Sequence, residues 1–194
     1  MSKTTLNLGS FGLADGNADK ILFFDDSAGA IGQLAASTNL TISGTNVTAS
    51  GGKILNVGHA VSTSEVTNNS TSSYADGNLT LNFTPTASDS TVLLILQLSI
   101  FLNHTTSADS AVRVKIFRDT TEIYDSNSTQ NYHSASGSGN GNVRFSTPLI
   151  YKDSPSTTSQ VTYSFDFLNP HSTQVIEISD NSAPSTLTAF EIGA

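Results

Sequence analysis

The residues best suited to acid–base or metal chemistry are the four histidines, and they are scattered along the chain. His59, His104, His133 and His171 lie far apart, and no two have the short spacing of metal ligands. Serines are abundant, but no Gly-x-Ser-x-Gly motif is present to expose a nucleophile. We therefore predict no catalytic residue, no metal site and no cofactor, and we interpret the histidines as solvated loop residues.

One acidic segment has part of the pattern of a calcium-binding loop. Asp15, Asn17 and Asp19 match its first three ligand positions, and Asp26 falls where the twelfth ligand would lie. The sixth position is Lys20 rather than glycine, and apolar residues typical of a strand follow it. We interpret the segment as a turn rich in Asp and Asn that precedes a strand.

Composition excludes several classes of protein. Charged residues make up 12% of the chain, and its net charge of −8 argues against a surface that binds nucleic acid. The longest apolar run, residues 92–102, is about half the ~20 residues that a membrane-spanning helix needs. With no cysteine and no apolar leader visible at the N-terminus, we expect assembly in a reducing cytoplasm.

The elements that must position any site are strands. Leu79, Leu81 and Phe83 alternate with polar residues, as do Val161, Tyr163, Phe165 and Phe167, which is the pattern of half-buried strands. In residues 92–102 the even positions are apolar and should share one face; the opposite face begins apolar at Leu93 and Ile95, so we place this strand centrally. About eight strands over residues 53–194 predict an all-β fold, an antiparallel β-sandwich of jelly-roll size.

The chain divides by composition near Gly51-Gly52. Residues 1–19 are expected to be a docking segment, and residues 20–52 contain short strand-like pieces that cannot fold alone. Their apolar residues need partners from the following domain or from other copies of the chain. These residues are Ile21, Phe23, Leu34, Leu40 and Ile42.

The C-terminus contains two β-prone runs around a polar turn. Residues 175–179 and 186–192 flank residues 180–185, and we predict a hairpin whose last strand is held in a sheet. Glu191 is the one charged residue of that last strand, and we expect it to pair with Arg113, Lys115 or Arg144.

Eight segments of the chain carry a resemblance to known proteins: residues 20–34, 40–49, 52–57, 81–85, 112–119, 153–155, 161–163 and 185–192. They resemble tail-fibre and related virion proteins of tailed phages, especially marine (podovirus- or cyanophage-like) ones. The resemblance implies a homotrimeric jelly-roll-like knob, of the TNF/C1q kind, after a short intertwined β segment. It implies a virion protein, assembled in the host cytoplasm, that attaches to the host surface and is not an enzyme.

The resemblance also implies three groups of contact residues. The expected trimer contacts are Ile21, Phe23, Leu34, Leu40, Ile42, Phe190 and Ile192. The expected contacts of the N-terminus with other virion proteins are Leu6, Leu8, Phe11 and Leu13. Loop residues expected to contact the host surface, with a cell-surface glycan as a candidate partner, are His104, Tyr132, His133, Asn140, Asn169 and His171.

Three alternative functions stay open at this point. The same resemblance fits a capsid decoration or cement protein with no receptor role, which differs in its place on the particle. A polysaccharide-degrading tailspike would need a catalytic pair of acidic residues, and none is evident in the sequence. A secreted carbohydrate-binding module would need a signal peptide, and none is visible.

Overall fold

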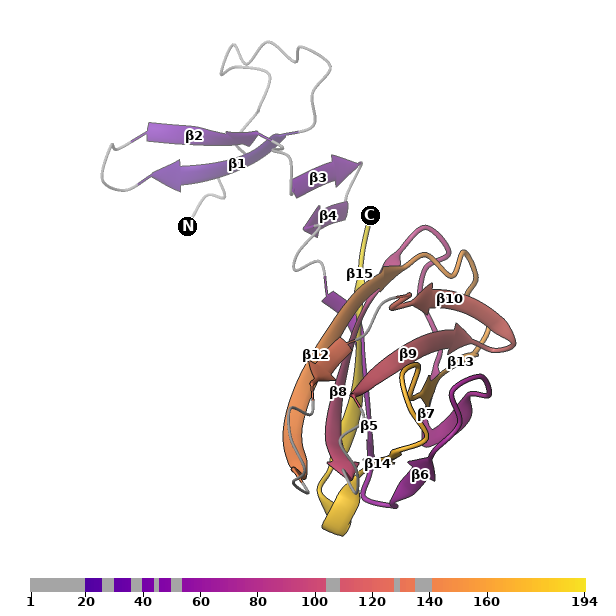
Figure 1. The fold of residues 1–194 in the computed structure, drawn as a ribbon. Helices are drawn as coiled ribbons and strands as arrows, with labels where there is room; N and C mark the ends of the chain where they lie inside the picture. The colour runs from indigo at the N-terminus through magenta and orange to yellow at the C-terminus, as the bar shows by residue number, and fades with distance from the viewer. Residues whose placement is uncertain are drawn as a thin grey trace, which may run out of the picture. The chain divides into compact units, whose positions relative to one another are not determined.

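A computed structural model describes the backbone of residues 20–25, 30–35, 40–43, 46–49, 54–103, 109–127, 130–134 and 141–194. It describes side chains in residues 54–103, 109–127, 132–134 and 141–194. The chain divides into two compact units, Met1–Gly52 and Lys53–Ala194. Figure 1 shows the strands of both units. The expected docking residues Leu6, Leu8, Phe11 and Leu13 lie outside the described residues.

The described part of the first unit consists of two antiparallel hairpins. Strand β1 (Lys20–Asp25) pairs with β2 (Ala30–Ala35), and β3 (Leu40–Ser43) pairs with β4 (Asn46–Ala49). The register places Ile21, Phe23 and Leu34 on one face of the first hairpin. Leu40 and Ile42 share a face of the second with Val47 and Ala49. Because a two-stranded hairpin is marginally stable alone, such faces need cover from other residues.

The second unit is a sandwich of two antiparallel sheets, which confirms the predicted fold class. Its elements are β5 (Ile54–Ser62), β6 (Val66–Asn68), β7 (Ala75–Phe83), β8 (Thr91–Asn103), β9 (Ser110–Arg118), β10 (Thr121–Asp125), β11 (Gln130–His133), β12 (Val143–Asp153), β13 (Val161–Leu168), β14 (Val175–Ile178), the 3-10 turn η2 (Asp180–Ser182) and β15 (Ser185–Ile192). Within the described residues no helix has the length and hydropathy that crossing a bilayer requires.

The order of the strands is that of a jelly roll. One sheet, here the β5 sheet, contains β5, β15, β8 and β12 in that order, with β14 and β6 extending it beside β8. The other, the β7 sheet, has the order β7, β13, β9, β10, with β11 also on β9. Numbered along the chain, the eight main strands run 1-8-3-6 and 2-7-4-5, the two interlocked Greek keys of a jelly roll.

The hydrophobic core lies between the two sheets and follows the predicted alternation. Leu94, Leu96, Leu98, Ile100 and Leu102 of β8 all face it and are at most 2% exposed. From β13, the residues Val161, Tyr163, Phe165 and Phe167 face them across the sandwich. Strand β8 is interior in its sheet, as expected, because β12 lies on one side of it and β15 and β14 on the other.

A β-bulge between β7 and β13 lies beside the Phe165 ring of this core. Asn78 has a left-handed φ of 51°, and its backbone N–H donates to the Asp76 carboxylate at 2.7 Å. Gly77 lies under the Phe165 ring, so that a Cβ at this position would overlap the ring. Glycine is therefore required here by the close approach of the ring to the backbone.

The predicted C-terminal hairpin is wrong. Strands β14 and β15 both pair antiparallel with β8 on the same side, β14 opposite residues 100–103 and β15 opposite residues 91–97. The intervening residues Ser179, Asn181 and Ser182 have positive φ, and this loop returns the chain to the same ladder instead of reversing it. The backbone N–H of Ser179 still donates to the Ser99 carbonyl at 2.9 Å, so the ladder with β8 nearly continues through the loop.

The predicted ion pair of Glu191 is also wrong. Its side chain is fully buried on the core side of β15 and contacts the turn that precedes β8. One carboxylate oxygen accepts from the backbone N–H of Thr86 at 2.8 Å and of Ala87 at 3.1 Å, and from the Ser90 hydroxyl at 2.7 Å. Three expected partners pair elsewhere: Arg113 with Asp125, Lys115 with Glu122, and Arg144 with Asp180.

Candidate functional site

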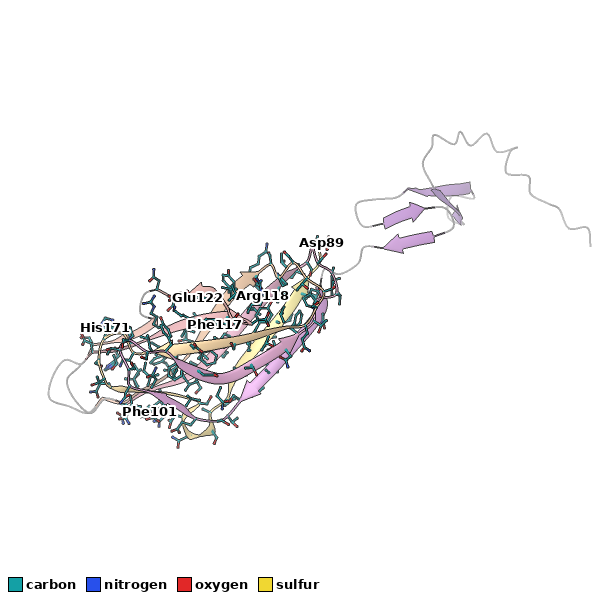
Figure 2. All side chains as sticks on the ribbon, turned by 90° about the vertical axis from the view of Figure 1, so that its right-hand side faces the viewer. Asp89, Phe101, Phe117, Arg118, Glu122 and His171 are labelled. Atoms are coloured by element: carbon teal, nitrogen blue, oxygen red, sulfur yellow. The ribbon has the colours of Figure 1, made fainter. Side chains whose placement is uncertain are left out.

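The expected recognition residues that the structure describes cluster at one end of the sandwich. Figure 2 shows His171 at the end opposite Asp89, and hence opposite the turn that leads into β8. Tyr132 of β11 and His171, in the loop between β13 and β14, lie in edge-to-face contact with ring centroids 5.2 Å apart. The Tyr132 hydroxyl donates to the carboxylate of Asp109, just before β9. Three separate segments thus converge at what we call the distal end.

The exposed groups at the distal end combine an aromatic ring with polar partners. Tyr132 is 50% exposed, and His171 is exposed beside it. The hydrogen bond to the Asp109 carboxylate raises the pKa of the Tyr132 phenol above its ordinary value of 10, because the proton is shared with an anionic acceptor. An exposed ring flanked by an imidazole and a carboxylate can stack on a sugar ring and hydrogen-bond its hydroxyls.

Asn169 does not belong to the exposed surface, contrary to expectation. It is fully buried, and its side-chain oxygen accepts from the backbone N–H of Ala111 and of His171 at 3.3 and 3.2 Å. Its side-chain nitrogen donates to the carbonyl of Gln174 at 3.0 Å. Asn169 therefore fixes the loop that carries His171, and acts on the distal end through that loop.

Of the three remaining expected recognition residues, the structure describes only His133. His133 lies on β11 and is half-buried. His104 and Asn140 lie outside the described residues. The signal that marks Tyr132 and His171 in the sequence is an aromatic or imidazole ring within a Ser- and Asn-rich loop, and Asn169 has the same loop context although it is buried.

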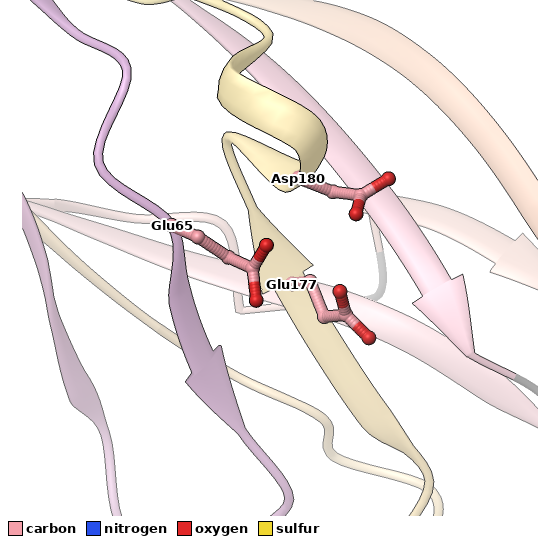
Figure 3. Close-up of side chains that lie close together, drawn as sticks. All are labelled: Glu65, Glu177 and Asp180. Carbon is pink, nitrogen blue, oxygen red and sulfur yellow. The ribbon is translucent and has the colours of Figure 1, made fainter.

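Three carboxylates form a cluster that the sequence did not indicate (Figure 3). Glu65 precedes β6, Glu177 lies on β14 and Asp180 begins η2, and one oxygen of each lies within 4.8 Å of the others. Burial raises the pKa of Glu177, and the neighbouring charges of Glu65 and Asp180 raise it further against a hydrogen bond from Asn103. The pairing of β6 with β14 brings these distant residues together.

The cluster has the oxygen ligands that a hard cation such as Ca²⁺ prefers. One of its members already has a cationic partner, because the guanidinium of Arg144 donates to the Asp180 carboxylate at 2.6 Å. Arg144 also lies over the Phe101 ring, 4.1 Å from its centroid. The arrangement compensates part of the negative charge within the chain itself.

The expected trimer contacts in the sandwich lie on the face of the β5 sheet that points away from the core, here the outer face. Phe190 and Ile192 are on it and are half-buried. Strongly exposed apolar side chains surround them: Ile54 is 59%, Val57 53% and Ile150 64% exposed. The side chains of the other expected trimer contacts, in the first unit, lie outside those that the structure describes.

The strand order and the distal end together define a jelly-roll domain with an exposed aromatic pair at one end. No protein-family model matches the sequence, and no curated protein matches it. Among solved structures, a chain of the infectious bursal disease virus T13 particle aligns over 85% of this chain and 42% of its own length, at 10% identity and a TM-score of 0.37.

A second similar structure is the VP2 subviral particle of infectious bursal disease virus. It aligns over 91% of this chain and 43% of its own length, at 11% identity and a TM-score of 0.34. This chain therefore spans less than half the length of either viral chain. Its assignment as a jelly roll rests on its own strand order.

Proposed function

We propose that this chain is a non-enzymatic structural protein of a phage particle, a short homotrimeric fibre or knob that attaches to the host surface. The observation that carries the proposal is the exposed Tyr132–His171 pair at the end of the sandwich opposite the turn that leads into β8. Strand β5 begins beside that turn, since Ile54 is opposite Ile192, and Ile192 is opposite Thr91. The chain thus enters the sandwich at one end and presents recognition groups at the other.

The first unit supplies the expected means of trimerisation. The register of its hairpins gathers Ile21, Phe23 and Leu34 on one face, and Leu40 and Ile42 on another. Copies of the segment meeting at these faces would cover them in a way that one copy of a two-stranded hairpin cannot. Three copies would multiply weak contacts at the distal end by avidity.

Attachment is tested by binding of the labelled full chain to intact marine cyanobacterial cells. We expect Tyr132→Ala to reduce binding at least about tenfold, as loss of a central aromatic contact does in a multivalent interface. Asp89→Ala, an exposed change at the opposite end of the sandwich, is the matched control and should bind as the parent does. Equal binding by both variants would contradict a role of the distal end in attachment.

Trimerisation is tested separately by analytical ultracentrifugation of the full chain. We expect a trimer at micromolar concentration, and we expect Phe23→Asp to give a monomer whose sandwich is still folded. A parent protein that sediments as a monomer would refute the trimer, and an intact trimer of the Phe23→Asp variant would refute the role of the hairpin.

The alternative function is a capsid decoration protein with no receptor role. The exposed apolar outer face favours it as a second candidate, since such a face also suits packing against other proteins of a particle. Antibody labelling of intact particles distinguishes the two functions: label on the head favours decoration, and label on the tail favours attachment.

A further inference from the structure

The two faces of the sandwich that point away from the core differ sharply in charge. On the β7 sheet this face carries ion pairs, Arg113 with Asp125 and Lys115 with Glu122, each with an N–O distance of 2.6 Å. Asp166 lies on it as well, and burial together with the nearby charge of Asp76 raises its pKa. This face therefore has the composition of a surface that remains in water.

Over β5, β15, β8 and β12 the outer face of the β5 sheet instead carries, apart from Lys152, apolar and uncharged residues in register. Farther along β8, the facing residues Arg144, Phe101 and Glu177 share this side. Facing residues of an antiparallel ladder share a side, so the pairings place three rows of four residues on this face. From β5 through β15 and β8 to β12, the rows are Val57–Phe190–Leu93–Lys152, His59–Thr188–Ile95–Ile150 and Val61–Thr186–Gln97–Pro148.

This face holds most of the exposed large apolar side chains in the described part of the chain. Ile54, Val57, Val61 and Ile150 are each more than half exposed, whereas on the β7 sheet only Tyr132 among the large apolar residues is comparably exposed. Ile95, at the centre of the face, is half-buried by its neighbours within the sheet. Exposed apolar side chains gathered on one side of a sheet indicate a surface that contacts another protein.

We propose that the outer face is a self-association surface, which packs against a second copy of this chain. Two features select a second copy as the partner. In the three rows Lys152 is the only Asp, Glu, Lys or Arg residue, so over these rows two copies of a chain with net charge −8 meet without acidic side chains; Glu177 lies beyond the rows on the same side. The face also begins at Ile54, two residues after the first unit ends at Gly52.

The size of the face indicates that it acts together with the first unit. Seven residues of β8 pair with β15, and four strands span the width, so the face measures roughly 23 Å by 19 Å, or about 400 Å². That is about half of the ~800 Å² that each partner buries in a standard interface. We therefore expect association through the outer face only where the first unit holds copies together and raises their effective concentration. The inference rests in this respect on the proposed homotrimer.

The test measures whether the outer face is covered in the full chain. Because the protein has no cysteine, an introduced thiol is the only one, and its reaction with a maleimide reports its exposure. The Ile95→Cys variant places the thiol at the centre of the outer face, and Ser164→Cys places it on the outward side of the β7 sheet. Both positions are half-buried within one chain, which makes the second a matched control.

We expect the Ile95→Cys thiol to react about tenfold or more slowly in the assembled protein than after Phe23→Asp is added. The Ser164→Cys thiol should react at the same rate in both. Because Phe23→Asp could leave the assembly intact, Ile150→Asp provides a second variant on an exposed side chain, and it should weaken association at least about tenfold by sedimentation without altering the circular dichroism spectrum.

The possible results separate this inference from the proposed function. An oligomer in which the two thiols react equally fast overturns the outer face as a contact and leaves the homotrimer intact. A monomer in which both thiols react fast overturns both proposals. A monomer with slow reaction at Ile95→Cys shows that residues 1–52 of the same chain cover the face, which also overturns the inference.

Discussion

Replacing the buried carboxylate of Glu191 by an amide is the sharpest test of how the sandwich is held together. This side chain joins the last strand to the turn before β8, and its oxygens accept from backbone N–H groups of Thr86 and Ala87 and from the hydroxyl of Ser90. All of these groups are donors. In Glu191→Gln, an NH₂ group replaces one carboxylate oxygen. It cannot donate to the backbone N–H groups, and of the three partners only the Ser90 hydroxyl oxygen can accept from it.

The expected destabilisation follows from the strength of these bonds. A hydrogen bond to a charged group contributes about 1.5–3 kcal/mol, and one between neutral groups contributes about 1 kcal/mol. Glu191→Gln keeps neutral bonds at one oxygen and relieves the burial of a charge, so we expect a net loss of about 2 kcal/mol. For a protein of this size that lowers Tm by about 6 °C. Glu191→Ala leaves several donors unpaired and should cost about 4 kcal/mol.

The stabilisation by the Glu191 carboxylate is larger at neutral pH than at acidic pH. Burial by itself would raise the pKa of Glu191, but the bonds from Ser90, Thr86 and Ala87 outweigh it, and the pKa lies below its ordinary value of 4.5. The unfolded chain then binds the proton more tightly than the folded one. The stabilisation by the carboxylate is fully present above about pH 4.5 and is lost as the pH falls through the lower folded-state pKa.

Chemical denaturation of parent and Glu191→Gln between pH 7 and pH 3 measures both effects. The difference in unfolding free energy should be about 2 kcal/mol at pH 7 and should shrink as the pH falls below 4.5, because the unfolded parent chain takes up the proton before the folded one does. Glu177→Gln is the control. Burial raises the pKa of Glu177, which means that its carboxylate is less stable in the folded protein than in the unfolded chain, so the substitution should be neutral or stabilising at pH 7. Equal stability of parent and Glu191→Gln at pH 7, or a constant difference across this range, would refute the reasoning.

Two further substitutions test the packing and the buried ion pair. Gly77→Ala should destabilise the sandwich by about 3 kcal/mol in thermal unfolding, because the added methyl overlaps the Phe165 ring, whereas Gly141→Ala should have little effect, since its nearest side-chain atom is 3.7 Å away. Arg118→Ala should cost about 3 kcal/mol in urea unfolding, because it removes the guanidinium that is 2.7 Å from the buried carboxylate of Asp153. A loss below 1 kcal/mol for either Gly77→Ala or Arg118→Ala would contradict the corresponding contact.

The features predicted correctly from the sequence are those set by local alternation. The even positions of residues 92–102 face the core because successive side chains of a strand point to opposite sides, and the same rule places Tyr163 and Phe165 inside. Of the candidate site, Tyr132 and His171 were both expected to lie in loops; they are in contact, with Tyr132 on β11, and their role in recognition stays a prediction.

The features that were not predicted depend on hydrogen bonds and strand pairing between residues far apart in the sequence. Glu191 bonds to residues about a hundred positions earlier, and neither its own strand nor the charges elsewhere indicated them. Asn169 is buried because its amide matches the backbone of two other segments, although its loop composition resembles that of an exposed residue. The β14–β15 hairpin failed because both strands gain more by pairing with β8 than with each other.

The sequence by itself therefore determined that this is an all-β protein and which residues of each strand are apolar, because the period of two is a property of the pleated chain. Only the tertiary structure decided what lies beside each residue. It left Leu93, Ile95 and Phe190 on the outward side of the β5 sheet, although their apolar character alone would assign them to a core. The order and register of strands that are far apart in the chain determine which residues face the core and which face outward.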